Sequence, residues 1–173
     1  MALHIRIFQP YARAHLFRII LTASPQANGF FNSSGLSGFL PAAYTLLSLR
    51  FLQVVGLAGK GSQISMREWR KGITGEADGW TYHAKGLWIT GKECLTVVGS
   101  SNYSKRSEEL DLEVGVLIVT RNEKLRIRMT EEQRWLLGNS RRVMEEDLRA
   151  SDRGIGWVVV VLVWIAGLLG TQL

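Results

Sequence analysis

Segments with the apolar spacing of strands alternate along the chain with segments that have the spacing of helices, and this alternation constrains the fold most. Strand-like patterns occupy residues 16–24, 62–69, 81–89, 94–98 and 110–120, and helix-like patterns occupy residues 41–55 and 130–149. Apolar side chains recur every second residue in a half-buried strand and every three or four residues in a helix. The pattern therefore predicts an α/β fold, a mixed sheet flanked by helices.

The two ends of the chain differ in composition from its middle. Residues 1–15 contain arginine and no acid, so we interpret them as a targeting or non-homologous segment, followed by one domain over residues 16–150. Residues 151–173 form an apolar tail, in which positions 154–173 carry no charge. As a helix this stretch would be about 30 Å long, near the thickness of a bilayer core. The tail is read as a membrane-associated helix, a packed terminal element or a span, with Trp157 and Trp164 on one face.

Charge and cysteine content exclude several classes of function. The net charge of +6 arises in residues 1–67, which hold six basic and no acidic residues, whereas the two signs balance after that point. This distribution is unlike the basic surface of a nucleic-acid-binding protein, so no nucleic-acid partner is expected. Cys94 is the single cysteine and the three histidines are scattered, so neither a disulfide nor a metal site is expected, and no cofactor.

His83 and Lys85 lie two residues apart in a predicted strand, which places both side chains on one face. An imidazole and an ammonium group that address one substrate group suit phosphate, because a neutral imidazole attacks phosphorus or transfers a proton. The structural alternative is a histidine with an ordinary hydrogen bond and a surface lysine.

The sequence Gly99-Ser100-Ser101-Asn102 follows the next predicted strand. Its backbone N–H groups, hydroxyls and amide are potential donors to phosphate oxygens, although the same letters also suit an ordinary turn. Glu113 shares a predicted strand face with Asp111. It could accept a bond from one ring nitrogen of His83 or pair with Arg106.

Together these motifs resemble the second HKD half of the phospholipase D superfamily: His83-Ala-Lys85, then Gly99-Ser100-Ser101-Asn102, then Arg106-Ser107 and Asp111-Leu112-Glu113. Within that superfamily, "TASPQANGFFNSSGLSGFLPAAYTLL", "REWRKG" and "GWTYHAKGLW" resemble the mitochondrial phosphatidylglycerophosphate synthases. The resemblance extends from about residue 21 to about residue 148. It implies a phospholipase D-like half-domain, at the mitochondrial inner membrane, with an apolar C-terminal helix or tail.

The resemblance also implies an activity: transfer of a phosphatidyl group from CDP-diacylglycerol to glycerol 3-phosphate through a phosphohistidine, without a metal. His83 would be the general acid and base, and Glu113 would orient it. The implied phosphate ligands are Lys85, Ser100, Ser101 and Asn102, with Arg106 and Asp111 in support. The partners implied are both substrates and a membrane phospholipid surface.

Two departures from the superfamily pattern bear on activity. Thr90 stands where an aspartate is expected five residues after the lysine, and no second H-x-K followed by G-S-x-N is found. The sequence therefore predicts the C-terminal half of such an enzyme, with little or no turnover by the isolated chain. The alternatives are a homodimer with two histidines acting as a phosphodiesterase, and a non-catalytic lipid- or membrane-binding fragment.

Overall fold

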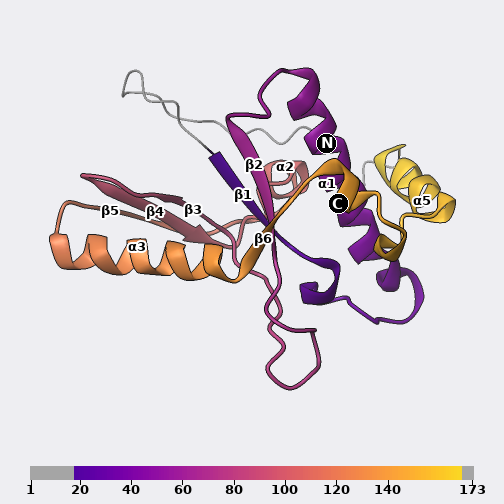
Figure 1. The fold of residues 1–173 in the computed structure, drawn as a ribbon, viewed down its shortest axis with the longest axis horizontal. Coiled ribbons are helices and arrows are strands. Elements are labelled where there is room, and N and C mark those ends of the chain that lie inside the picture. The colour runs from indigo at the N-terminus through magenta and orange to yellow at the C-terminus, as the bar shows by residue number, and fades with distance from the viewer. Residues whose placement is uncertain (1–17, 169–173) are drawn as a thin grey trace. The chain divides into compact units, whose positions relative to one another are not determined.

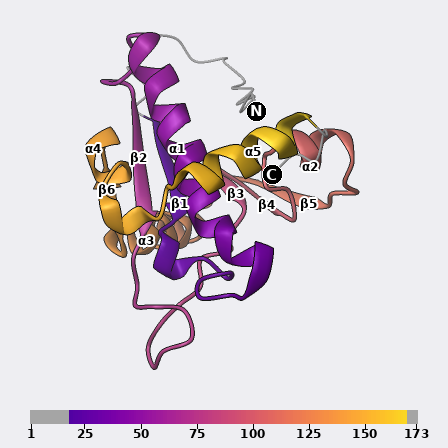
Figure 2. The same cartoon turned by 90° about the vertical axis from the view of Figure 1, so that its right-hand side faces the viewer.

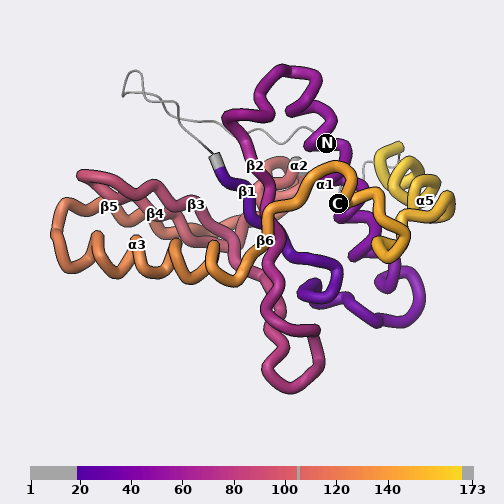
Figure 3. Tube along the Cα trace, viewed as in Figure 1, coloured from indigo at the N-terminus to yellow at the C-terminus, as the bar shows by residue number. Residues whose placement is uncertain are grey.

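The computed structural model describes residues 18–168, which divide into two compact units. Unit 1 comprises residues 84–138 and the last helical turn, residues 165–168, and unit 2 comprises residues 18–83 and 139–164. The colours of the trace in Figure 3 show this discontinuity, because unit 2 is built from the early and late parts of the chain. The expected targeting segment lies outside the described residues.

The sheet of unit 2 has three strands in the order β1-β2-β6: β1 (Arg18–Ala23), β2 (Ile64–Trp69) and β6 (Ser140–Val143). β1 and β2 are parallel, with Arg18 opposite Ile64, and β6 is antiparallel to β2. Parallel neighbours require a crossover, which here contains the helix α1 (Leu40–Leu57). The strand predicted at 16–24 is confirmed over Arg18–Ala23, with residues 16 and 17 outside the described residues, and the strand predicted at 62–69 and the helix predicted at 41–55 are confirmed.

Short helices complete unit 2. They are η1 (Pro25–Ala27), η2 (Gly35–Phe39), α4 (Glu145–Leu148), η3 (Ser151–Arg153) and α5 (Trp157–Leu168), whose last turn falls in unit 1. The core joins α1, β2, β6 and α4 through Leu49, Met66, Val143 and Leu148. Figure 2 shows α1 beside the strands β1 and β2.

Of the helices in the described part of the chain, one is long and apolar enough to cross a membrane, the stretch Gly35–Leu57. It includes α1, whose residues Leu46 and Leu49 are each only 7% exposed. Because α1 carries the core of unit 2 and its C-terminal part contains the exposed Arg50, we assign it as a core helix.

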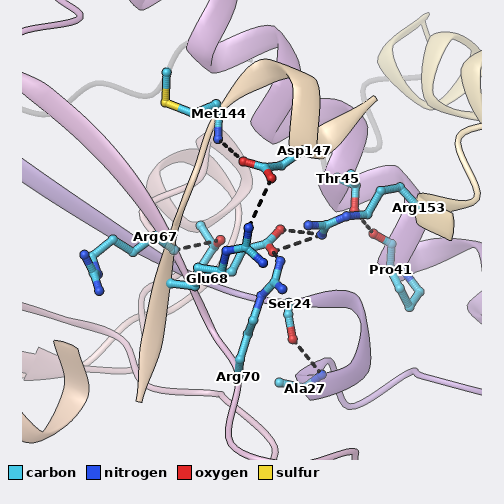
Figure 4. A network of polar contacts seen from close by, with 12 residues as sticks. Ser24, Ala27, Pro41, Thr45, Arg67, Glu68, Arg70, Met144, Asp147 and Arg153 are labelled. Carbon is cyan, nitrogen blue, oxygen red and sulfur yellow. Dashed lines mark hydrogen bonds and ion pairs between the residues drawn. The ribbon is translucent and has the colours of Figure 1, made fainter. Parts of the chain in front are cut away.

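A buried ion pair joins the two chain segments of unit 2 (Figure 4). Glu68 on β2 is 2% exposed, and Nη1 of Arg153 lies 2.8 Å and 2.9 Å from its two carboxylate oxygens. Arg70 adds a second contact, Nη2 to Oε2 at 2.9 Å. Removing one partner of such a pair leaves an uncompensated buried charge, which typically costs about 3–5 kcal/mol. The pair therefore fixes residue 153, just before α5, to the middle of the sheet.

Unit 1 contains an antiparallel sheet in the order β3-β4-β5, made of β3 (Gly86–Ile89), β4 (Cys94–Gly99) and β5 (Gly115–Thr120), with helices α2 (Lys105–Glu109) and α3 (Glu123–Gly138) (Figure 1). α3 covers one sheet face, where Cys94 and Thr96 are buried together with Met129 of the helix. Fold class is thus as expected: α/β, with a mixed sheet in unit 2, an antiparallel one in unit 1, and helices around both.

Three predicted elements are wrong in extent. The strand predicted at 81–89 begins only at Gly86, because Tyr82 N–H donates to Ala27 O (2.9 Å) in unit 2 instead of to a sheet neighbour. His83 and Lys85 therefore precede the strand. The strand predicted at 110–120 begins at Gly115, since the N–H groups of residues 110 and 111 bond to Arg106 O at the end of α2.

The helix predicted at 130–149 is displaced. α3 begins at Glu123, where Asn122 Oδ1 accepts the Leu125 N–H (3.1 Å), and it ends at Gly138. Residues 140–143 then pair with β2 as strand β6, and only Glu145–Leu148 return to helix as α4. Tertiary pairing with β2 outweighs the local helix preference there.

Candidate functional site

The predicted site residues are distributed over both units. His83 is the last residue of the first segment of unit 2, whereas the other candidates belong to unit 1: Lys85, Ser100, Ser101, Asn102, Arg106, Asp111 and Glu113.

The turn after β4 depends on a close approach of two backbones. Gly99 lies opposite Gly115 in the sheet, and a Cβ atom at position 99 would lie 2.5 Å from Val114 O. This distance leaves no room for a side chain, so the glycine of the G-S-x-N motif is required for packing. Immediately after it, Ser100 N–H donates to Val114 O (2.9 Å) and Val114 N–H donates to Ser100 Oγ (3.0 Å).

The Ser100 hydroxyl also donates to a carboxylate oxygen of Glu113. The bond from Ser100 and, after it, one from Ser107 lower the pKa of Glu113 below its ordinary value; desolvation opposes them, and the positive charge of Lys85 adds a smaller lowering effect. Glu113 is consequently ionised at neutral pH. A carboxylate held in this way can orient a histidine or balance the charge of an imidazolium.

Ser107 is a site residue to which the sequence assigned no role. It is 5% exposed, and its Oγ accepts the N–H of Asn102 (3.1 Å). Its own N–H donates to Ser104 Oγ (3.3 Å), the N-cap of α2. The sequence signal that could have indicated this role is the S-x-x-S spacing of Ser104 and Ser107, which is typical of a capped helix start after the turn.

The Asn102 side chain is exposed, and within the described part of the chain its amide makes no hydrogen bond. Ser101 Oγ accepts the N–H of Tyr103 (3.1 Å), which leaves its hydroxyl hydrogen for another acceptor. Lys85 reaches the same turn through its backbone, because Gly99 N–H donates to Lys85 O (3.2 Å). Unit 1 therefore brings Lys85, the turn and Glu113 together.

Arg106 and Asp111 form an ion pair with each other, Nε to Oδ1 at 3.2 Å, with side chains 61% and 33% exposed. Such an exposed pair contributes little stability, about 0–1 kcal/mol. The two residues close the loop between α2 and β5, next to Glu113 but without a bond to it.

Thr90 occupies the position at which the HKD pattern has an aspartate. Its hydroxyl donates to Gln133 Oε1 (3.0 Å), which ties the end of β3 to α3. The residue therefore has a structural partner within unit 1.

His83 is exposed, and the chain before it is firmly held. The ring of Tyr82 packs on that of Trp69, with centroids 5.5 Å apart, and burial raises the pKa of Tyr82 to about 12. Among residues 18–168, no group of three or more His, Cys, Asp and Glu residues has the arrangement of a metal site.

Comparison with known proteins yields no matching protein-family model. The chain is 41% identical over 158 residues to a Saccharomyces pastorianus CDP-diacylglycerol–glycerol-3-phosphate 3-phosphatidyltransferase, an alignment that covers 86% of this chain and 30% of the relative. It is 37% identical over 148 residues to the human mitochondrial protein of the same name, covering 82% of this chain and 25% of that one.

A solved structure, phosphatidylserine synthase of Haemophilus influenzae, matches with a TM-score of 0.64 at 23% identity and shows the same fold over 88% of this chain and 33% of that one. The chain thus spans about a third or less of the length of the proteins it matches.

Proposed function

Because the chain is homologous over most of its length to one segment of the CDP-diacylglycerol–glycerol-3-phosphate 3-phosphatidyltransferases, we propose that it forms one half of a phosphatidyltransferase active site. The observation that carries this proposal is the arrangement of Lys85, the Gly99–Asn102 turn and an ionised Glu113 in unit 1. Cationic and neutral donors beside a turn suit a phosphate group, and the carboxylate suits a histidine partner.

The proposed reaction proceeds in two displacements at phosphorus. A histidine nitrogen from the other half-site attacks CDP-diacylglycerol, forming an N–P bond while the P–O bond to CMP breaks. The hydroxyl oxygen of glycerol 3-phosphate then attacks the phosphatidyl-histidine, and the N–P bond breaks. His83 gives a proton to the leaving CMP oxygen and later takes one from the attacking hydroxyl.

In unit 1, Lys85, Ser101 and Asn102 would donate to the phosphate oxygens as charge develops. Ser100 was expected to join them, but its hydroxyl hydrogen is directed to Glu113, so we assign it the role of holding that carboxylate. Arg106 and Asp111 support the loop.

The proposed location is the surface of the mitochondrial inner membrane, in keeping with relatives named as mitochondrial and with a substrate whose acyl chains lie in a bilayer. A homodimer, which would bring two copies of His83 together, remains the alternative source of the second histidine.

A chimera tests the proposal. The homologous segment of the Saccharomyces pastorianus transferase is replaced with this chain, and CMP release is measured with CDP-diacylglycerol and glycerol 3-phosphate. We expect turnover that falls at least about 100-fold in His83→Ala and Lys85→Ala chimeras, whereas Lys92→Ala, in the exposed turn between β3 and β4, leaves it unchanged. A folded chimera without activity would contradict the proposal.

The same assay of CMP release is also performed on the chain alone. We expect no CMP release from it, and turnover at the rate of the chimera would show that the half-site is sufficient, as a homodimer requires. Hydrolysis of a generic phosphodiester by the chain alone would favour the single-motif phosphodiesterase.

The exposed apolar side chains of α5 specifically favour a second candidate, a non-catalytic membrane-binding fragment. It predicts vesicle binding by the chain alone together with an inactive chimera.

A further inference from the structure

The exposed side of α5 is a continuous apolar stripe. Besides Gly167, six residues of α5 are exposed; all six are apolar and recur at the spacing of one helical face: Trp157, Val160, Val161, Trp164, Ile165 and Leu168. The two tryptophans, 78% and 62% exposed, are the largest members of this stripe. A helix of a water-soluble surface normally carries polar residues on its outer face, so the α5 stripe requires an apolar or interfacial partner.

The opposite side of α5 is attached to the protein. Val159 and Val163 are 3% and 8% exposed. The chain before the helix is fixed by the ion pair of Arg153 with Glu68, and a Cβ at Gly154 would lie 3.7 Å from Ala42 Cβ of α1. A spanning helix would have to give up these contacts.

The chemistry of the stripe favours lipid over protein or nucleic acid. Residues 154–168 carry no charge. Residues 141–153 before them hold four arginines and four acidic residues, so the net charge next to the start of the helix is zero. Tryptophan prefers the boundary between head groups and acyl chains, and here Trp157 and Trp164 lie one above the other along the stripe. An interaction driven by apolar burial depends little on lipid charge or salt.

We propose that α5 lies flat in the surface of a phospholipid bilayer, with the stripe in the interface and its Val159–Val163 side on the protein. This inference rests on the proposed membrane location and goes beyond it, because it assigns the contact residues and the orientation of the helix.

Flotation of the full chain with vesicles tests the contact. Vesicles of phosphatidylcholine alone and with one part in five phosphatidylglycerol serve as probes, and we expect the chain to float with both. The double substitution Trp157→Ser and Trp164→Ser, and separately Val161→Lys, should weaken binding at least about tenfold. The matched control is Leu57→Ser, at a 90% exposed apolar position at the end of α1, which should bind as the unchanged chain does. Circular dichroism verifies the fold of each variant.

Labelled positions test the orientation. In a Cys94→Ala background, an environment-sensitive probe is placed at 157, 161 or 164, and quenchers are placed at shallow and deep positions of the acyl chain. A flat helix gives the same shallow depth at all three positions, whereas graded depths would indicate a span and overturn the proposal.

The outcomes separate the two levels of inference. A chain that does not float contradicts the membrane location itself, while the chimera assay still reports on the proposed chemistry. A chain that floats equally well with its stripe substituted contradicts only the role of α5. A third outcome would also overturn the proposal: the unchanged chain does not bind vesicles but sediments as a dimer, and the stripe substitutions abolish that dimer. The stripe would then contact a second copy of the chain.

Discussion

Ser100 links three parts of unit 1. It directly follows the last residue of β4, and it forms hydrogen bonds with the backbone of Val114 and with the carboxylate of Glu113. Its hydroxyl is the first cause of the lowered pKa of Glu113. A lowered carboxylate pKa means that the interaction is fully present above the ordinary pKa of glutamate and is lost as pH falls through the folded-state pKa.

We therefore expect Ser100→Ala to move the pKa of Glu113 upward, toward its ordinary value. The measurement is a titration of the Glu113 side-chain carboxyl carbon by NMR. Ser101→Ala is the control, because the Ser101 hydroxyl accepts the N–H of Tyr103 instead of bonding to Glu113. An unchanged pKa in Ser100→Ala would contradict the assigned hydrogen bond.

Tyr82 gives a prediction at alkaline pH. Burial raises its pKa to about 12, compared with about 10 for a free phenol. The buried phenol therefore stabilises unit 2 fully below pH about 10, and this contribution is lost as pH rises toward about 12. We expect the free energy of unfolding, measured with urea, to fall between pH about 10 and about 12 in the unchanged chain. It should fall less in Tyr82→Phe, which keeps the contact with Trp69 but has no phenol to ionise. Identical profiles in both chains would contradict the assignment.

At the scale of elements, the sequence predicts well the segments whose apolar spacing agrees with their tertiary role. α1, β1, β2 and β4 are of this kind. The strand β6 was missed because "SRRV" has a helix-compatible pattern and becomes a strand only by pairing with β2. Long-range pairing of this kind leaves no local signal.

The candidate site shows the same limit. Its residue types and their spacing could be read from the motifs. Their contacts could not be predicted, because His83 and Asp111, which were expected in strands, lie in loops. The assignment of Ser100 to Glu113, and the burial of Ser107, depend on how α2 folds between β4 and β5.

The β4–β5 junction can be tested at position 99. Gly99→Ala would force a Cβ against Val114 O, so the ends of both strands must separate. We expect faster hydrogen exchange at the amides of Ser100 and Val114 and a loss of about 1–3 kcal/mol of stability. Gly138→Ala, where no atom lies within 4 Å of an added Cβ, should be nearly neutral. Equal protection in both variants would show that the approach is not tight.

The helix α5 depends on the ion pair before it. Arg153→Ala leaves Glu68 buried with its remaining partner Arg70, so we expect a loss of about 3–5 kcal/mol in urea unfolding. Arg70→Ala should cost only about 0–1 kcal/mol, because its side chain is 35% exposed. Similar losses in the two variants would mean that Arg153 is not the principal partner.

At the scale of the whole molecule, unit 1 has an apolar sheet face opposite α3. The pairing of the strands places six aliphatic residues there: Leu87, Ile89, Leu95, Val97, Leu117 and Val119. Of these, Leu117 and Val119 are 60% and 53% exposed. Exposed faces of this kind cause association in water.

We expect the isolated chain to self-associate as its concentration rises, and Leu117→Lys with Val119→Lys to reduce that association. Sedimentation velocity over a concentration series measures it. Leu112→Lys, at a 95% exposed position in the loop before β5, controls for added charge. An equal effect of the control would show that charge alone, rather than the sheet face, is responsible.

The division of unit 2 into two chain segments has a consequence for the order in which the molecule acquires structure during synthesis. Residues 84–138 of unit 1 form one continuous stretch and leave the ribosome before β6 and Arg153 exist. During that interval β2 lacks a neighbour on one edge, and the carboxylate of Glu68 has no Arg153 to neutralise it. The sheet of unit 2 is therefore completed only after residues 84–138 of unit 1 have been synthesised, because β6 and Arg153 follow those residues in the chain.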